Sequence, residues 1–393
     1  MKLLSPAGDW ISLRAAVKAG CDAVYFGIKE FNMRANAKNF SLGELGKIVE
    51  FCHSNNIKAY LTLNSIVYDD EIKNLVKVIS KAKVDAIICW DYAVLNECVK
   101  LRIPIHLSTQ ASISNYNALK LYKKKFPLIK SVNLARELSL EQIKKIIKQI
   151  KKDKLGVEIE TFIHGAMCVS VSGRCFLSQE VFGRSANRGD CIQPCRRKYD
   201  VKDMEEKHSF SLGEDHVMSP KDLCTIEIID KLIKAGINVG KIEGRNRSPE
   251  YVKVVTESYR EAIDNKKYDK KQLKNKLKTV YNRGFSTGFY MGKPINEWSK
   301  VYGSKATTKK QYIGKVLNYF KKVGAAEILL EAGSLKLGDK VMVQGNTTGI
   351  VEDDVKEMQI NKKRINNAKK GEMIALKIKK LRKKDKVYKI INV

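Results

Sequence analysis

Four of the nine cysteines in this 393-residue chain fall within one short window and could ligate a soft metal. They are Cys168, Cys175, Cys191 and Cys195, and they follow the spacing C-x6-C-x15-C-x3-C. Thiolates are the ligands that zinc and iron–sulfur clusters select. Five arginines lie in the same part of the chain and would offset the negative charge of four thiolates: Arg174, Arg184, Arg188, Arg196 and Arg197.

The spacing favours an iron–sulfur cluster over a zinc site. Structural zinc sites use close C-x2-C to C-x4-C pairs, and only Cys191 and Cys195 resemble such a pair. An iron–sulfur cluster tolerates irregular spacing and is helped by nearby hydrogen-bond donors. Zinc and a set of free thiols are the alternatives, and Cys224 is a spare thiol downstream.

The remaining cysteines, Cys21, Cys52, Cys89 and Cys98, stand in apolar segments and are predicted to be small buried hydrophobes. No run of eighteen apolar residues predicts a membrane span, and the short N-terminal apolar run is not a signal peptide. We therefore expect a cytoplasmic location, where cysteines stay reduced.

Eight short apolar runs, alternating with helical patterns, predict a barrel of parallel strands. Their near-continuous apolar character is typical of strands buried on both faces. Eight β/α units over residues 1–300 favour a TIM-like (β/α)8 barrel, with a doubly wound sheet as the alternative. The runs are residues 3–5, 23–27, 59–64, 86–90, 105–109, 131–135, 157–163 and 239–243.

Polar residues at the carboxyl ends of these strands are candidates for catalysis, because barrel enzymes build their sites there. The candidates are Asn64, Gln110, Arg136, His164 and Glu243. Arg34, Arg136 and Arg245 could together bind a polyanion such as phosphate or a dicarboxylate, since guanidinium groups match these ligands bidentately. A lone histidine such as His164 could equally be a structural group.

Two further segments stand apart from the regular β/α pattern. Residues 165–238, between strands seven and eight, form a long cysteine-bearing insertion, and long connections in compact domains are usually functional. From residue 305 short strands and turn signals predict a small β-barrel over 305–393. Its GSLKLGDKVMVQG segment resembles the second domain of translation elongation factors.

The charge of the chain favours an RNA partner. The net charge is +31, and residues 305–393 alone carry 22 Lys and Arg against 9 Asp and Glu. Basic surfaces of this kind neutralise phosphates. The alternatives are a Lys-rich composition inherited from an AT-rich genome, and an accessory barrel that serves solubility or oligomerisation.

The cysteine window and its surroundings resemble peptidase family U32, the collagenase-like proteins. The family signature stands here without mismatch as Glu160, Phe162, Gly165, Ala166, Met167, Cys168, Gly173, Cys175, Leu177 and Ser178. The segments LLSPAGD, NMRANAKNF, HLSTQAS and KIEGRNRSPEYV are similar to the family as well. The resemblance covers at least residues 1–300.

Within this family the chain resembles the subgroup of tRNA hydroxylation proteins. That resemblance implies tRNA as partner and prephenate-dependent 5-hydroxylation of its wobble uridine, with prephenate as a small dicarboxylate co-substrate. A related member acts on a cytidine of ribosomal RNA. The resemblance also implies a 4Fe-4S cluster on Cys168, Cys175, Cys191 and Cys195, although relatives differ in the late cysteine, so that Cys224 could replace Cys195.

The older family name implies a peptidase instead. The chain contains no HExxH zinc helix. His164 could in principle activate Cys168 as a nucleophile, but four thiols beside arginines fit metal ligation better. A non-catalytic RNA-binding protein is the third hypothesis.

Overall fold

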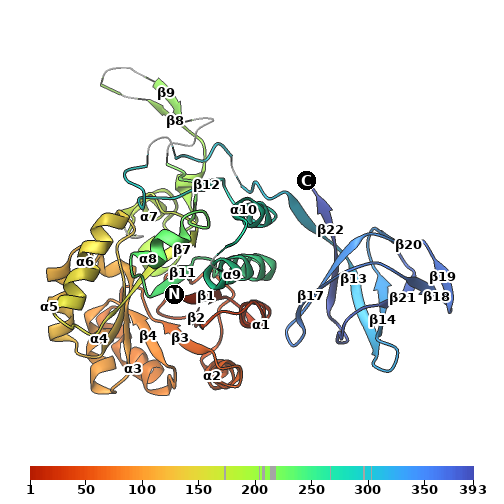
Figure 1. Cartoon of the computed structure of the whole chain (residues 1–393), viewed down its shortest axis with the longest axis horizontal. Coiled ribbons are helices and arrows are strands. Elements are labelled where there is room, and N and C mark those ends of the chain that lie inside the picture. The colour runs from red at the N-terminus through yellow and green to blue at the C-terminus, as the bar shows by residue number, and fades with distance from the viewer. Residues whose placement is uncertain are drawn as a thin grey trace.

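Eight parallel strands close into a barrel in the computed structural model (Figure 1). The structure describes residues 1–171, 174–202, 204–205, 209–212, 218–265, 267–294, 297–301 and 303–393. β1 pairs with β2 and with β11, and β11 also pairs with β7, which closes the ring. The TIM-like barrel is thus confirmed, and the open doubly wound sheet is excluded. The barrel strands are β1 (Lys2–Ala7), β2 (Ala23–Gly27), β3 (Lys58–Thr62), β4 (Ala86–Cys89), β5 (Ile105–Leu107), β6 (Ile129–Asn133), β7 (Glu158–Gly165) and β11 (Val239–Ile242).

Helices cover the outside of the barrel, and α6 (Leu140–Lys152) shows why these segments are helical. Ser139 and Gln142 form a capping box at its start. Five apolar residues at helical spacing are buried against the sheet: Leu140, Ile143, Ile146, Ile147 and Ile150. Each such side chain contributes about 1.5–3 kcal/mol when fully buried. The other helices of the barrel layer are α1 (Trp10–Lys18), α2 (Leu45–His53), α3 (Ile72–Lys81), α4 (Tyr92–Lys100), α5 (Tyr116–Lys125), α8 (Ile229–Lys234), α9 (Pro249–Asp264) and α10 (Lys270–Lys278).

The segment between β7 and β11 lies over the carboxyl ends of the strands. It contains α7 (Leu177–Phe182) and the hairpin of β8 (Tyr199–Lys202) and β9 (Ser209–Leu212), which projects from the body in Figure 1. β10 (Asp222–Cys224) pairs antiparallel with β7 and parallel with β12 (Phe285–Ser286). The cysteine window is therefore held at the barrel mouth; Gly173 of the signature lies outside the described residues.

The C-terminal region, for which the sequence predicts a small β-barrel of short strands, is an antiparallel sheet. Its eight strands run in the order β17-β16-β22-β13-β14-β21-β18-β19, and β15 (Ser334–Lys336) pairs with β20 (Asn367–Lys369). The strands of the larger sheet are β13 (Thr308–Phe320), β14 (Ala325–Leu330), β16 (Lys340–Gly345), β17 (Gly349–Asp354), β18 (Met358–Ile360), β19 (Lys363–Ile365), β21 (Met373–Lys377) and β22 (Lys386–Asn392).

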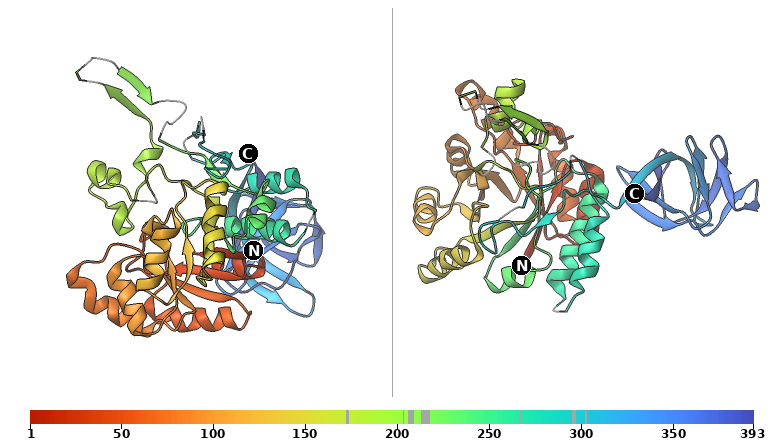
Figure 2. Two further views of the ribbon diagram at one scale, coloured as in Figure 1. Left: turned by 60° about the vertical axis from the view of Figure 1, so that its left-hand side comes forward. Right: turned by 90° about the horizontal axis from the view of Figure 1, so that it is seen from above.

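The sheet docks on the barrel beside α1, as Figure 2 shows from two further directions. Ala15 of α1 packs against Met342 and Ile350. Nε of Arg14 donates to the carbonyl oxygen of Asn346 at 2.7 Å, and Nζ of Lys18 donates to that of Thr348 at 2.9 Å. Apolar contact and hydrogen bonds together fix the sheet against this side of the barrel.

Cys21, Cys52, Cys89 and Cys98 are all buried in the core, as the sequence predicts for them. Among the helices of the described chain, none combines the length and the apolar composition needed to cross a bilayer.

Candidate active site at the barrel mouth

The four cysteines of the window line one cavity at the mouth of the barrel, with a volume of about 120 Å³. Cys168 follows β7, Cys175 precedes α7, and Cys195 lies in the short turn Pro194–Arg196. Arg34, Gln110 and Arg136 line the same cavity. Cys224 is instead buried in β10, where its sulfur lies 3.9 Å from the hydroxyl of Tyr259, and it is not among the described residues that line the cavity.

The thiols of the window influence one another and face hydrogen-bond donors. Burial raises the pKa of Cys195 to about 11; the Arg196 guanidinium opposes this shift and the other three thiols add to it. The backbone N–H of Leu177 donates to Sγ of Cys175 at 3.3 Å, and that of Gln193 donates to Sγ of Cys191 at 3.4 Å. Such N–H···S bonds stabilise thiolates that ligate iron.

The donor set, four thiols at one cavity, is of the kind that binds a 4Fe-4S cluster. In the part of the chain that the structure describes, no three Cys, His, Asp or Glu side chains are placed to bind one metal ion. Zinc would need all four thiolates around one centre, whereas a 4Fe-4S cluster takes one thiolate at each of its irons. The four thiols that line the cavity equal in number the four ligands that either centre takes, and two of them accept hydrogen bonds from backbone N–H groups.

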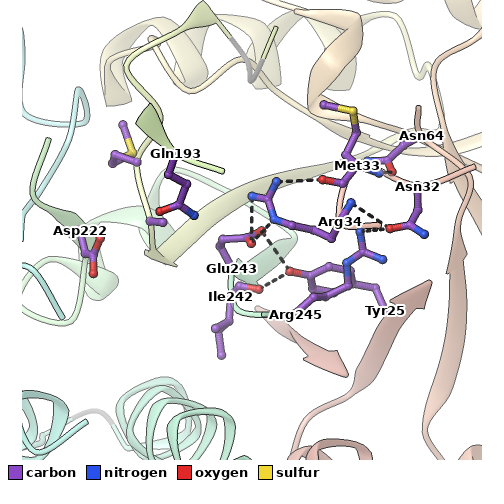
Figure 3. A network of polar contacts seen from close by, with 12 residues as sticks. Tyr25, Asn32, Met33, Arg34, Asn64, Gln193, Asp222, Ile242, Glu243 and Arg245 are labelled. Carbon is purple, nitrogen blue, oxygen red and sulfur yellow. Dashed lines mark hydrogen bonds and ion pairs between the residues drawn. The ribbon is translucent and has the colours of Figure 1, made fainter. Parts of the chain in front are cut away.

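Arg34, Arg245 and Tyr25 lie around Glu243 in a network of polar contacts (Figure 3). Both Nε and Nη2 of Arg34 lie 3.2 Å from Oε1 of Glu243. The hydroxyl of Tyr25 donates to the carbonyl oxygen of Ile242 at 2.7 Å. Arg245 donates to Oγ1 of Thr62 at 2.8 Å and to Oδ1 of Asn32 at 3.1 Å, so both of its terminal nitrogens are engaged.

The network carries an excess of positive charge. Burial alone would raise the pKa of Glu243, but Arg34, Arg136 and Arg245 hold it below its ordinary value. Glu243 is therefore ionised at neutral pH and balances one of three guanidinium groups. Burial lowers the pKa of Arg245 to about 10, which still leaves that group charged at neutral pH. The excess charge suits an anionic ligand.

Arg136 is the guanidinium best placed for such a ligand. Its Nη1 donates to the carbonyl oxygen of Ala166 at 2.9 Å, and its guanidinium lies 3.8 Å from the ring centre of Phe162. Its Nε is buried and has no hydrogen-bond partner among the described residues. Because an unpaired buried donor costs about 1–3 kcal/mol, a bound carboxylate would recover free energy here.

Gly27 at the end of β2 makes room for this network. A Cβ built on Gly27 would lie 2.1 Å from Nη1 of Arg245. Any side chain at this position would therefore displace Arg245 from Thr62 and Asn32.

The amides predicted from the strand ends lie side by side. Nδ2 of Asn64 donates to Oε1 of Gln110 at 3.4 Å, and Oδ1 of Asn64 accepts from the backbone N–H of Met33 at 3.1 Å. The hydroxyl of Ser108 also donates to Oε1 of Gln110. Only Gln110 of the two amides lines the described part of the cysteine cavity, where it could contact a ligand.

His164 faces away from this group. The register between β7 and β11 shifts between Lys241 and Ile242, so that β7 contains one extra residue there. The shift turns the His164 ring to the outer layer, against Tyr251, Tyr259 and Phe285. This packing favours a structural role for His164 over a catalytic one. It also places the buried His164 ring apart from Cys168, which is exposed.

Two buried histidines should make the fold sensitive to mild acid. Burial lowers the pKa of His164 to about 3 and that of His106 to about 4. Both remain neutral in the folded state at pH 5, whereas the unfolded chain binds a proton at each below pH 6.5. Stability is therefore complete above pH 6.5 and falls toward pH 5, by about 2 kcal/mol for each group. Urea unfolding of wild type and His164→Gln at pH 7 and pH 5 tests this; an equal pH dependence in the two proteins would contradict it.

Sequence reasoning missed the residues that hold the arginines in place. Tyr25 lies inside β2, Thr62 is the last residue of β3 but lies inside the predicted run 59–64, and Asn32 lies in the loop after β2. The rule that selected strand ends passes over such positions. Strand alternation offered a signal for Tyr25, because a polar hydroxyl inside an apolar strand needs a buried partner.

The chain is similar both to a protein named as a collagenase and to proteins named for the hydroxylation of RNA. Residues 8–300 match the model of peptidase family U32. The chain is 42% identical to a collagenase of Porphyromonas gingivalis, over 99% of this chain and 97% of that protein. It is 38% identical to tRNA hydroxylation protein P1 of Bacillus subtilis, over 81% and 77%. It is 39% identical to a 23S rRNA 5-hydroxycytidine synthase of Escherichia coli, over 67% of this chain and 39% of that protein.

Proposed function

The chain belongs to peptidase family U32, and from this premise we propose that it hydroxylates a base in RNA. The finer proposal is 5-hydroxylation of the wobble uridine of tRNA, with prephenate as co-substrate. Relatives named for tRNA hydroxylation and for synthesis of 5-hydroxycytidine in ribosomal RNA support the class of reaction. The observation that carries the proposal is the single cavity where four cysteines meet Arg34, Arg136 and Gln110.

In this proposal Cys168, Cys175, Cys191 and Cys195 hold a 4Fe-4S cluster, which would supply redox chemistry beside the base. Cys195 is preferred to Cys224 as the fourth ligand because Cys195 lines the cavity and Cys224 is packed in the core. The proposal concerns the donor set and fixes no distances to iron.

The chain's own side chains would bind and orient the two substrates. Arg136, with its buried unpaired Nε, would bind a carboxylate of the co-substrate. Arg34, which is already paired with Glu243, would bind the same carboxylate from the other side of that ion pair. Gln110 would hydrogen-bond to the edge of the base in the cavity. A base can reach this cavity only after extrusion from its stack.

A peptidase is the second candidate, which the similarity to the collagenase favours. The geometry gives it little support, because the ring of His164 packs against Tyr251 and Tyr259 of α9 and does not reach Cys168 among the described contacts. A cysteine nucleophile needs a base within hydrogen-bond reach.

The two candidates separate in one experiment. The chain is expressed in a bacterial host that lacks its own U32 hydroxylases, and nucleosides from tRNA and ribosomal RNA are analysed by mass spectrometry. We expect a uridine one oxygen atom heavier in tRNA, absent from the host with the empty vector. Unmodified RNA together with cleavage of gelatin by the purified protein would replace the hydroxylase with the peptidase.

A further inference from the structure

A basic groove separates the barrel from the C-terminal sheet, outside the cysteine cavity. Its volume is about 960 Å³, at the upper end of the roughly 300–1,000 Å³ typical of small-molecule sites. One wall is formed by the residues after β1 and β11 and by the start of α9. The other wall is formed by two turns of the sheet, before β17 and before β22. Figure 1 shows these turns beside α1.

The lining of the groove is strongly cationic. Eight Lys or Arg residues and two Asp residues line it. The cationic residues are Lys38, Arg245, Arg247, Lys310, Arg382, Lys383, Lys384 and Lys386. Asp9 is already paired with Lys38 at 2.7 Å and caps α1 through the N–H of Ser12 at 2.8 Å. Asp9 thus neutralises Lys38, and Lys310 pairs with Glu250 at 2.9 Å, which leaves six of the eight cationic side chains without an ion pair in the described part of the chain.

The other acidic residue, Asp385, fixes the most cationic turn. Its buried carboxylate accepts from the backbone N–H of Arg382 at 2.8 Å and from the hydroxyl of Thr348 at 2.5 Å. The N–H of Lys384 donates to the carbonyl oxygen of Val316 at 2.8 Å. Lys383 and Lys384 are exposed, and neither forms an ion pair within the described chain. The turn is thus rigid while its ammonium groups stay available to an external anion.

The groove leads to the candidate active site. Asn36 and Asn246 line both the groove and the cysteine cavity. Asn246 directly follows Arg245, and Asn36 lies two residues after Arg34. A chain-like anion in the groove would therefore pass beside the cavity mouth.

We propose that this groove binds the phosphate backbone of the RNA substrate, so that one extruded base enters the cysteine cavity. The identification of the polyanion as RNA rests on the proposed function. The groove, its positive charge and its opening to the cavity are features of the structure and do not depend on that function. Lysines that track a backbone bind phosphates without reading sequence, and extrusion supplies the base to the neighbouring cavity.

The test compares two matched double substitutions in the full chain. Lys383→Glu with Lys384→Glu changes the groove, and Lys362→Glu with Lys363→Glu changes the turn after β18 and the first residue of β19, neither of which lines the groove. All four lysines are exposed, and each pair contains one residue with a left-handed backbone, Lys384 at φ 71° and Lys362 at φ 64°. Filter binding of an unmodified tRNA transcript is measured at several concentrations of potassium chloride.

We expect the groove variant to bind about tenfold or more weakly at about 0.1 M salt, and the slope of log Kd against log salt to fall by about 2. The control pair should stay within about twofold of wild type. Equal weakening by both pairs, or wild-type binding by the groove pair, overturns the proposal, as does undetectable binding by the wild-type protein. Failure of the proposed function appears differently: the wild type then binds tRNA through the groove but leaves its nucleosides unmodified.

Discussion

Serine in place of Cys168, Cys175, Cys191 or Cys195 is expected to remove bound iron and to abolish RNA hydroxylation. Each substitution deletes one thiolate from the set that lines the cavity. Loss of an outer-shell partner already costs about 10–100-fold in metal affinity or activity, so loss of a ligand should cost at least about a hundredfold. Iron, zinc and acid-labile sulfide are measured in anaerobically purified protein, together with the absorption spectrum.

Two other cysteines serve as controls for this series. Cys98→Ser changes a buried thiol on the outside of the barrel, and Cys224→Ser changes the thiol packed beside Tyr259. Both proteins should keep wild-type iron content with some loss of stability. Iron retained by Cys195→Ser but lost by Cys224→Ser would move the fourth ligand to Cys224. A wild-type protein that contains zinc and no iron would refute the cluster.

The barrel could be predicted from the sequence because each strand is a short run buried on both faces. The 23–27 run matches β2 residue for residue, and the other seven runs overlap the observed strands. Differences are confined to strand ends, such as β7, which continues to Gly165. Strand ends depend on neighbouring elements, here β10 pairing with Gly165 and His164, and such pairing leaves no local pattern.

The candidate site was predictable only in part, for a related reason. Strand-end position led to Arg34, Gln110 and Glu243, which meet at the mouth. The same rule gave no information on side-chain direction, and the extra residue in β7 reverses the direction of His164. A β-bulge is set by the register with a strand distant in sequence, so alternation along β7 alone could not reveal it.

The groove and the cavity together explain a division of charge along the chain. Five of the eight cationic residues that line the groove are lysines, which are flexible point charges; the other three are Arg245, Arg247 and Arg382. Arginines, with their planar forks, gather around Glu243 inside the mouth. Lysine suits sequence-independent phosphate contacts, and arginine suits bidentate recognition of a carboxylate. The two surfaces therefore match the two substrates of the proposed reaction.

Replacement of Arg136 by Met is expected to weaken binding of the carboxylate co-substrate and to leave the affinity for RNA unchanged. Arg136 lines the cavity and not the groove, and its buried Nε has no hydrogen-bond acceptor among the described residues. Removing one partner of a buried charge pair costs about 2–5 kcal/mol, so KM for prephenate should rise by at least about 30-fold. Arg136→Lys keeps the charge without the fork and should fall between Met and wild type.

Arg364→Met is the matched control for this substitution. Arg364 is exposed and pairs with Glu357 at 3.1 Å on the surface of the C-terminal sheet, where an ion pair contributes about 0–1 kcal/mol. It should leave KM for prephenate and the Kd for tRNA within about twofold of wild type. The readouts are the initial rate of tRNA hydroxylation against prephenate concentration and filter binding of the same tRNA. The opposite result would be a higher Kd for tRNA in Arg136→Met with an unchanged KM for prephenate. That result would mean that Arg136 binds an RNA phosphate inside the cavity and not the co-substrate.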